Sequence, residues 1–181
     1  MRFTSLTLAA VASLIVATPT LARNPMVGGA AMYPAKNIVE NAVNSKDHTT
    51  LVAAVKAAGL VQTLEGPGPF TVFAPTNAAF AKLPAGTVDN LVKPENKATL
   101  TSVLTYHVVP GRITAQMIAS NARAHHGTAT YTTAQGGTLR FMRSGAGWMI
   151  MDGKGNRGMI TIANVMQSNG VIHVIDSVMM P

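Results

Sequence analysis

One run near the end of the chain contains the residue types of a nucleophilic triad. Ser168, His173 and Asp176 supply a hydroxyl, an imidazole and a carboxylate in close succession. A working triad requires a hydrogen bond from the serine to the histidine and another from the histidine to the acid. In an extended segment His173 and Asp176 point to opposite faces, because they are three residues apart, and the chain has no G-x-S-x-G nucleophile elbow. We therefore expect His173 to be packed or hydrogen-bonded inside the fold, and we predict no enzymatic activity.

A glycine pattern also matches the dinucleotide fingerprint G-x-G-x-x-G, at Gly153, Gly155 and Gly158. That fingerprint binds phosphate where a strand precedes it and a helix follows it. Here strand-like segments flank the glycines on both sides, with MIMD before them and MITIANV after them. The pattern therefore predicts a turn between two strands, and we expect no nucleotide and no other cofactor.

Methionine and histidine residues provide a metal-handling alternative. The chain has 11 Met, and thioethers suit Cu(I). Met149 and Met151 would share one strand face, although Met also fills irregular cores. His125 and His126 are adjacent, but neighbouring side chains in an extended loop diverge, and no carboxylate or Cys nearby completes a tetrahedral site. We expect core packing and a solvated loop rather than a metal site, and periplasmic copper handling stays open as an alternative.

The composition excludes several classes of protein. The chain has 181 residues, no Cys and a formal net charge of +7, and its basic residues are scattered. The absence of Cys excludes disulfides and Cys-ligated zinc or iron–sulfur sites. Scattered charge with few aromatic residues argues against nucleic-acid binding and favours at most weak attraction to acidic glycans or anionic lipid headgroups.

The first residues have the pattern of a secretory signal peptide. Arg2 is a positive n-region, residues 6–17 form an apolar h-region, and TLA at 20–22 suits cleavage after Ala22. The apolar run is shorter than the roughly 20 residues that span a bilayer. We expect a signal peptide over residues 1–22, a mobile leader over 23–36 and one domain over 37–181, exported to the periplasm or secreted.

Residues 70–84 (FTVFAPTNAAFAKLP) organise the predicted fold. Residues 70–73 indicate a buried strand that ends at Pro75, and Thr76 is placed to cap a short helix over 77–83. We expect Phe73 and Phe80 to meet in the core. Apolar residues at helical spacing predict further helices at 38–43, 51–58, 60–64, 87–91, 94–107 and 114–119. A period of two predicts strands at 128–133, 138–143, 148–152, 159–165 and 171–178, so the fold class is α+β.

Several of these segments resemble, in the same order, those of the fasciclin-type domain, a secreted adhesion module. Residues 70–84 resemble its first signature and residues 170–181 (GVIHVIDSVMMP) its second, and Tyr106-His107 matches its tyrosine–histidine pair. The resemblance covers roughly residues 37–181. It implies a compact antiparallel β-wedge flanked by several short helices. It also implies structural roles for the signature residues Phe70, Phe73, Pro75, Thr76, Asn77, Phe80, His173 and Asp176.

Tyr106 and His107 have two interpretations. In related adhesion proteins of this family the pair lies in a stretch linked to integrin binding, so the resemblance implies an interaction site. In the sequence itself, His107 continues the apolar helix stripe of Leu100, Val103 and Leu104, which predicts a buried, neutral, hydrogen-bonded imidazole. Tyr106 is about 100° further round the helix and is expected near the edge of the contact, partly exposed.

The residues and the resemblance together predict an exported, non-enzymatic binding module. We expect it to be a monomer that mediates adhesion or contacts a cell-surface, envelope or matrix protein or an acidic glycan. No nucleic-acid partner is expected, and membrane contact is at most peripheral. Besides copper handling, a second alternative is a carrier of a small apolar ligand, which requires an apolar cavity.

Overall fold

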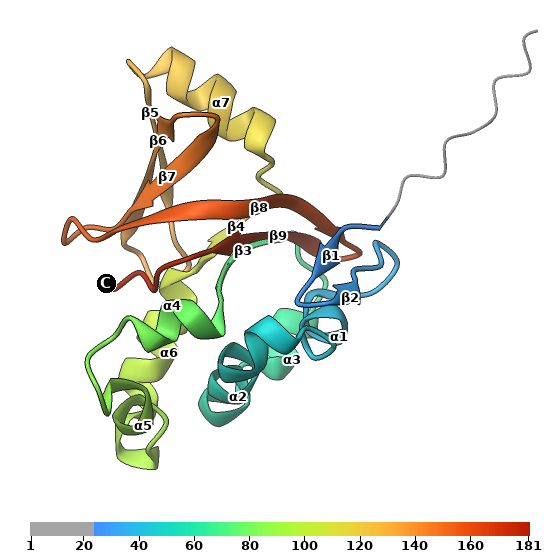
Figure 1. The fold of residues 1–181 in the computed structure, drawn as a ribbon, viewed down its shortest axis with the longest axis vertical. Coiled ribbons are helices and arrows are strands. Elements are labelled where there is room, and N and C mark those ends of the chain that lie inside the picture. The colour runs from blue at the N-terminus through green and yellow to red at the C-terminus, as the bar shows by residue number, and fades with distance from the viewer. Residues whose placement is uncertain (1–23) are drawn as a thin grey trace, which may run out of the picture.

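The computed structural model describes residues 24–181, so the predicted signal peptide at 1–22 lies outside the described residues. A seven-stranded sheet has most of the helices packed below it and one helix, α7, beside its far end (Figure 1). The helices are α1 (Ile38–Ala42), α2 (Thr49–Ala58), α3 (Val61–Glu65), α4 (Asn77–Ala81), α5 (Thr87–Leu91), α6 (Lys97–Tyr106) and α7 (Ala115–Ala124), with 3-10 turns η1 (Lys46–His48) and η2 (Pro94–Asn96). No helix in this part of the chain is long and apolar enough to cross a membrane.

The strands confirm the expected change of period in the second half of the chain. Each predicted helix and strand has a counterpart, although α7 runs on to Ala124 instead of ending near residue 119. The strands are β1 (Met26–Val27), β2 (Ala30–Ala31), β3 (Phe70–Pro75), β4 (Val108–Pro110), β5 (Thr128–Thr132), β6 (Thr138–Ser144), β7 (Gly147–Met151), β8 (Arg157–Gln167) and β9 (Gly170–Ile175). The α+β class is therefore confirmed.

The order of the large sheet is β4-β3-β9-β8-β7-β6-β5. Strands β3 and β9 are parallel, with Phe73 opposite His173, whereas the other neighbouring strands are antiparallel. The sheet is thus mixed rather than wholly antiparallel. The reason is topological, because β9 returns to the centre of the sheet beside β3 after the β5–β8 meander has been added at one edge.

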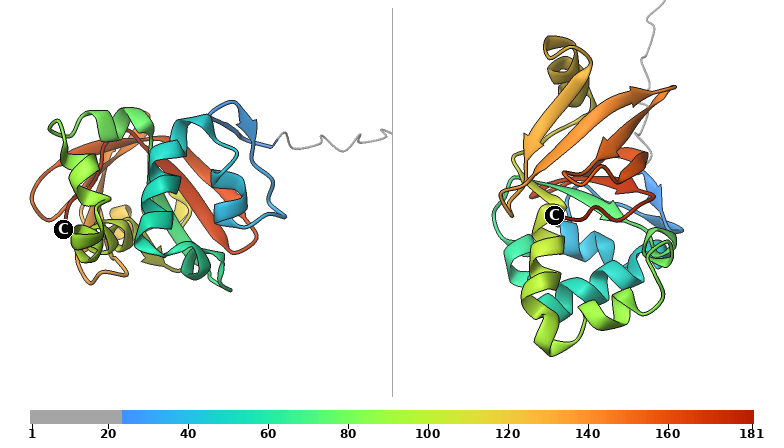
Figure 2. Two further views of the ribbon diagram at one scale, coloured as in Figure 1. Left: turned by 90° about the horizontal axis from the view of Figure 1, so that it is seen from below. Right: turned by 90° about the vertical axis from the view of Figure 1, so that its left-hand side faces the viewer.

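The sheet curls so that its two edges approach each other (Figure 2). The Ala134 N–H, just after β5, donates to the Val108 carbonyl of β4 at 2.7 Å. One core cluster fills the inside of this curl, and α7 contributes Ile118 and Ala122 to it. A second cluster lies between the opposite sheet face and helices α1 to α6. The wedge shape follows from these two cores on the two faces of one sheet.

Strand β3 supplies side chains to both cores, because successive residues of a strand point to opposite faces. Val72 and Ala74 belong to the helix-side cluster, whereas Phe73 lies inside the curl, with its ring centroid 5.0 Å from that of Phe141. Phe80 of α4 packs in the helix-side cluster. The predicted contact between Phe73 and Phe80 is therefore wrong, since the sheet separates the two rings.

The segment predicted as a mobile leader differs from that expectation. Residues 24–36 contain the β1–β2 hairpin, and they bury Val27 and Met32 in the helix-side core. The turn of the hairpin is also tied to the rest of the fold, because the Lys46 N–H donates to the Gly28 carbonyl. The sequence of this segment has no helical or alternating period, so its two apolar anchors were not recognisable as core residues.

Candidate functional site

The Tyr106–His107 pair lies where α6 leads into β4, and the Tyr106 ring belongs to the core cluster inside the curl of the sheet. His107 is buried, as predicted from the apolar stripe. Tyr106 is buried as well, with 1% of its surface exposed, so the expectation of a partly exposed ring is wrong. The reason is the curl of the sheet, which brings the β5–β6 and β7–β8 turns over the end of α6. Neither side chain presents a surface to a partner in this structure.

Both ring nitrogens of His107 have partners. Nδ1 lies 2.8 Å from the Val103 carbonyl, which can only accept, so Nδ1 carries the proton. Nε2 then accepts the Met179 N–H at 2.9 Å. Burial lowers the pKa of His107 from its ordinary 6.5 to about 4, and the Val103 carbonyl opposes this shift without cancelling it. The imidazole is therefore neutral and joins α6 to the C-terminal segment.

The Tyr106 hydroxyl joins two turns of the sheet. It donates to the Thr138 carbonyl at 2.7 Å and accepts the Gly153 N–H at 2.9 Å. Burial raises the pKa of Tyr106, so the phenol stays protonated as the donor. The ring also lies against Gly137, where an added Cβ would come within 2.5 Å of the ring. Gly137 thus leaves room for the tyrosine.

Asp152 completes this network from the turn before β8. Its carboxylate has no exposed surface, and it accepts the backbone N–H groups of Lys154, Asn156 and Met180 and the side-chain amide of Asn156. His107 and Asp152 therefore hold residues 179–180, while Tyr106 fixes the turn beside Asp152. We name Tyr106, His107 and Asp152 the C-terminal clamp. Gly153 and Gly155 lie in a turn between two strands, as predicted, whereas Gly158 already belongs to β8, opposite Ile150. Asp152 organises the turn internally.

The residues of the apparent triad do not meet. His173 stacks on Phe73, donates through Nε2 to the Ile113 carbonyl at 2.8 Å, and accepts the Asn164 N–H at Nδ1. Burial lowers the pKa of His173. Asp176 instead accepts the Met159 N–H at 2.7 Å and lies 3.5 Å from Lys82 Nζ. Both act as structural contacts at the centre and the end of β9.

Burial and charge act in opposite directions on Asp176. Burial alone would raise the pKa of its carboxyl group. Hydrogen bonds from the Met159 N–H and the Ser177 hydroxyl, together with the nearby Lys82 ammonium, hold that pKa below its ordinary value. The carboxylate is therefore ionised at neutral pH, where it fixes the end of β9 to β8.

The signature residues of the first segment connect the core to the helices. Phe70, Phe73 and Pro75 are β3 residues, and Thr76 caps α4 by accepting the Ala79 N–H at 3.2 Å. Asn77 accepts from the backbone of Thr50 and donates to the Lys46 carbonyl, which ties α4 to α2 and η1.

The histidine pair and the two methionines of the copper alternative lie on different elements of the structure. His125 and His126 are exposed beyond α7, and His125 Nδ1 lies 2.8 Å from the Asn121 carbonyl of the same helix. Met149 and Met151 are half-buried on one face of β7. Among residues 24–181, no group of three or more His, Asp or Glu side chains could hold an ion.

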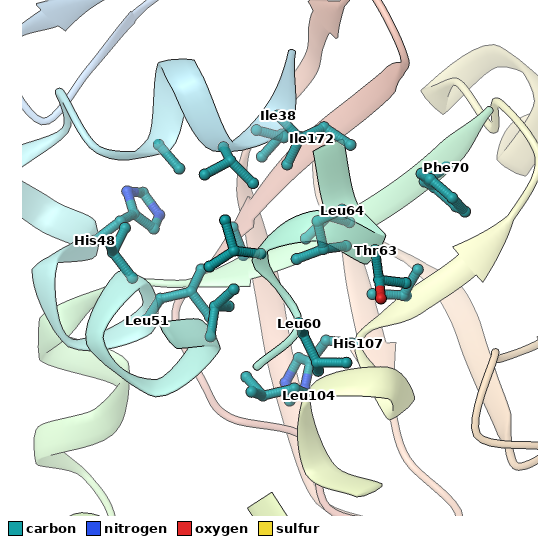
Figure 3. Close-up of a pocket in the computed structure, with 18 of the residues that line it drawn as sticks. Ile38, His48, Leu51, Leu60, Thr63, Leu64, Phe70, Leu104, His107 and Ile172 are labelled. Atoms are coloured by element: carbon teal, nitrogen blue, oxygen red, sulfur yellow. The ribbon is translucent and has the colours of Figure 1, made fainter. Parts of the chain in front are cut away.

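An apolar cavity of about 120 Å³ lies in the helix-side core. Figure 3 shows Ile38, Leu51, Leu64 and Ile172 around it, with His48 and Phe70 on opposite sides of the view. The β1–β2 segment closes part of its wall through Val27 and Met32. His107 also lines the cavity, although both of its nitrogens are engaged elsewhere.

Several polar residues of this region were not recognised from the sequence. His48 is 2% exposed on the cavity wall, and Asn41 is fully buried, where its side-chain amide exchanges two hydrogen bonds with the Tyr33 backbone and also bonds the Gln167 side chain. For His48, the one feature of the sequence that pointed to a buried contact was its spacing from a neighbouring serine. Ser45 and His48 are three apart in a polar break before a helix, which is a spacing that allows a side-chain contact.

Comparisons with known proteins identify the family. A model described as "Fasciclin domain" matches residues 46–181. Protein sll1483 of Synechocystis is 48% identical over 90% of this chain and 83% of its own length. The immunogenic protein MPB70 of Mycobacterium bovis is 36% identical over 98% of this chain and 94% of its own. The cell surface glycolipoprotein MPB83 of the same species is 36% identical over 88% of this chain and 68% of its own length.

The fold is also found among solved structures. The FAS1 domain pair of the insect cell adhesion molecule Fasciclin I superposes with a TM-score of 0.71 at 16% identity, over 81% of this chain and 51% of that one. At this identity the likeness concerns the fold. The matched model and the curated relatives carry the assignment, and the chain belongs to the fasciclin domain family.

Proposed function

We propose that this protein is an exported, non-enzymatic binding module that mediates adhesion or contacts a protein of the cell surface, envelope or matrix. Its membership of the fasciclin family supports this proposal, because relatives are described as a cell surface glycolipoprotein and, for the fold, a cell adhesion molecule. The interior supports it as well. The buried polar side chains that resemble catalytic groups, His107, His173 and Asp152, all make structural hydrogen bonds. Asp176, which is partly exposed, does so as well.

Residues 26–43, which we name the N-terminal segment, carry the contact surface that we propose. Five large apolar side chains are exposed in the described part of the chain, and three of them, Met26, Tyr33 and Val43, lie between β1 and the end of α1. The Lys36 ammonium lies 5.3 Å from the centre of the Tyr33 ring, which adds a positive charge to this surface. Exposed aromatic residues beside a cation are typical of protein contact sites.

A cell-binding assay tests the proposed partner class. The processed protein, labelled with a fluorophore, is added to cells of its source organism that lack it. We expect saturable binding that is lost when the cells are first treated with protease and is retained after glycosidase treatment. Absence of saturable binding would contradict the proposed function, and loss with glycosidase alone would move the partner to a glycan.

A further inference from the structure

Three buried histidines differ in how their ring nitrogens are used. His107 and His173 each have partners at both nitrogens, as described above. His48 has one partner, because its Nδ1 lies 2.8 Å from Ser45 Oγ and its Nε2 has no hydrogen-bond partner among residues 24–181. A buried polar atom without a partner costs free energy, so such an atom in a native structure indicates an unidentified contact.

His48 lies on the wall of the apolar cavity (Figure 3). The surface that lines this cavity is almost wholly carbon, drawn from α1, α2, α3, β3 and the β1–β2 segment. Its volume of about 120 Å³ approaches that of an engineered apolar cavity of about 150 Å³ that binds benzene. The space therefore suits an apolar body of about six non-hydrogen atoms, the size of a benzene ring.

The chemistry of His48 selects the polar part of such a molecule. Burial lowers the pKa of His48, while a weak polar contact with the Ala74 backbone, which does not reach hydrogen-bond geometry, and the charge of Asp47 oppose the shift, so the ring is neutral at pH 7. Ser45 Oγ can donate to Nδ1 or accept from it, which leaves Nε2 as either a donor or an acceptor. A hydroxyl group fits both cases, because it donates and accepts.

A charged head group fits this site poorly. An ionised carboxylate pays a large desolvation cost among apolar walls. Lys56 contributes the one side chain with a formal charge to the lining, and it is exposed, so its ammonium remains in water. The walls thus favour a neutral ligand over an anion.

We propose that this cavity is a binding site for a small neutral aryl or alkyl alcohol, whose apolar body fills the cavity and whose hydroxyl pairs with His48 Nε2. The site uses other side chains than the proposed contact surface: Met26, Tyr33 and Val43 do not line the cavity, whereas their neighbours Val27, Met32 and Ala42 do. The proposal narrows the alternative function, a carrier of a small apolar ligand, to a carrier of small neutral alcohols.

Calorimetric titration of the processed protein with phenol, toluene and benzoate tests the proposal. We expect phenol to bind at least as tightly as toluene, although its hydroxyl loses more water, and benzoate to bind at least tenfold more weakly than phenol. Toluene binding without phenol binding would overturn the pairing with His48, as would preferential binding of benzoate through Lys56. Failure of all three probes to bind would overturn the site itself.

Two variants locate the site. His48→Phe should weaken phenol binding about tenfold and change toluene binding less than threefold, because the hydroxyl loses its partner. Its matched control is His125→Phe at the exposed histidine beyond α7. Ala42→Leu, which adds a side chain to the cavity wall, should weaken both ligands, whereas Ala53→Leu on the exposed face of α2 should weaken neither. Unchanged phenol binding in folded His48→Phe or Ala42→Leu protein would overturn the proposal.

Discussion

At the scale of residues, the side chains that suggest chemistry are the ones that hold the fold together. His107 links α6 to the C-terminal segment, and His173 links β9 to the Ile113 carbonyl and the Asn164 N–H. Each imidazole is a donor at one nitrogen and an acceptor at the other, so each must stay neutral. These histidines are therefore expected to control stability rather than turnover or binding.

Removing the imidazole of His107 tests this role. His107→Ala leaves the Val103 carbonyl and the Met179 N–H without their partner inside the core. We expect a loss of about 1–3 kcal/mol from the unpaired groups, measured by urea denaturation. The matched control His125→Ala, at an exposed histidine, should change stability by less than about 0.5 kcal/mol. Equal stabilities of the two variants would place His107 outside the structural network.

Stability should also fall in mild acid. The pKa of His107 is about 4 when folded and 6.5 in the free side chain, so the unfolded chain binds more protons between these pH values. The contribution of neutral His107 is complete above pH 6.5 and is lost as the pH falls towards 4, a loss on the order of 3 kcal/mol.

Denaturant melts at a series of pH values measure this effect. Because the pKa values of His48 and His173 are lowered too, the wild-type protein should lose stability steeply from pH 7 to pH 4. His107→Gln should make this dependence shallower, whereas the exposed substitution His125→Gln should not. An unchanged slope in His107→Gln would show that His107 does not contribute to the loss of stability in acid.

At the scale of elements, local patterns predicted the helices and strands but not how the sheet closes. Pro75, Thr76 and the apolar spacing of residues 70–84 defined β3, the cap and α4, because each signal acts within a few residues. The burial of Tyr106 depends on the curl of the sheet and on turns 32 and 47 residues away. Such contacts leave no periodic trace in the sequence, so the cavity and the hairpin of residues 24–36 were not predicted either.

The packing of α4 can be tested at Phe80. This ring is buried in the helix-side core, so Phe80→Ala should cost about 3–5 kcal/mol in denaturant melts. Tyr33→Ala, at an aromatic residue that is 47% exposed, is the control and should cost far less. A loss below about 1 kcal/mol at Phe80 would mean that α4 does not pack as described.

The cap of α4 is a separate element-scale contact. Thr76 Oγ accepts the Ala79 N–H, and Thr76→Ala removes this bond while keeping the backbone. We expect a loss of about 1 kcal/mol, with Thr76→Ser restoring most of it. If serine and alanine destabilise equally, the methyl group of Thr76 rather than its hydroxyl matters.

At the scale of the whole molecule, buried residues stabilise the fold and exposed residues carry the proposed recognition surface. The C-terminal clamp and the two cores fix the wedge, and the N-terminal segment carries three of the exposed large apolar side chains. The cavity lies within the helix-side core and is lined in part by Val27, Met32 and Ala42 of the N-terminal segment. Recognition at the surface can therefore be altered without disturbing the network around His107.

The proposed function requires that the chain is exported, and the sequence predicts this export. The n-region at Arg2, the apolar run and the small residues at 20–22 predict cleavage after Ala22. Intact-mass measurement of the protein from the periplasm or the culture medium should give a chain that begins at Arg23. A chain that retains Met1 would contradict both the processing and the localisation.

The most direct test of the account separates the contact surface from the scaffold in one experiment. Cell binding and thermal melts are measured for a surface variant, Met26→Ser with Tyr33→Ser and Val43→Ser, and for the clamp variant His107→Ala. Val92→Ser with Met117→Ser, at the other two exposed large apolar residues among residues 24–181, serves as the matched control. We expect the surface variant to melt like the wild type and lose cell binding, and the clamp variant to melt earlier yet bind normally while folded. Normal binding by the surface variant, with binding lost in folded His107→Ala protein, would contradict the account.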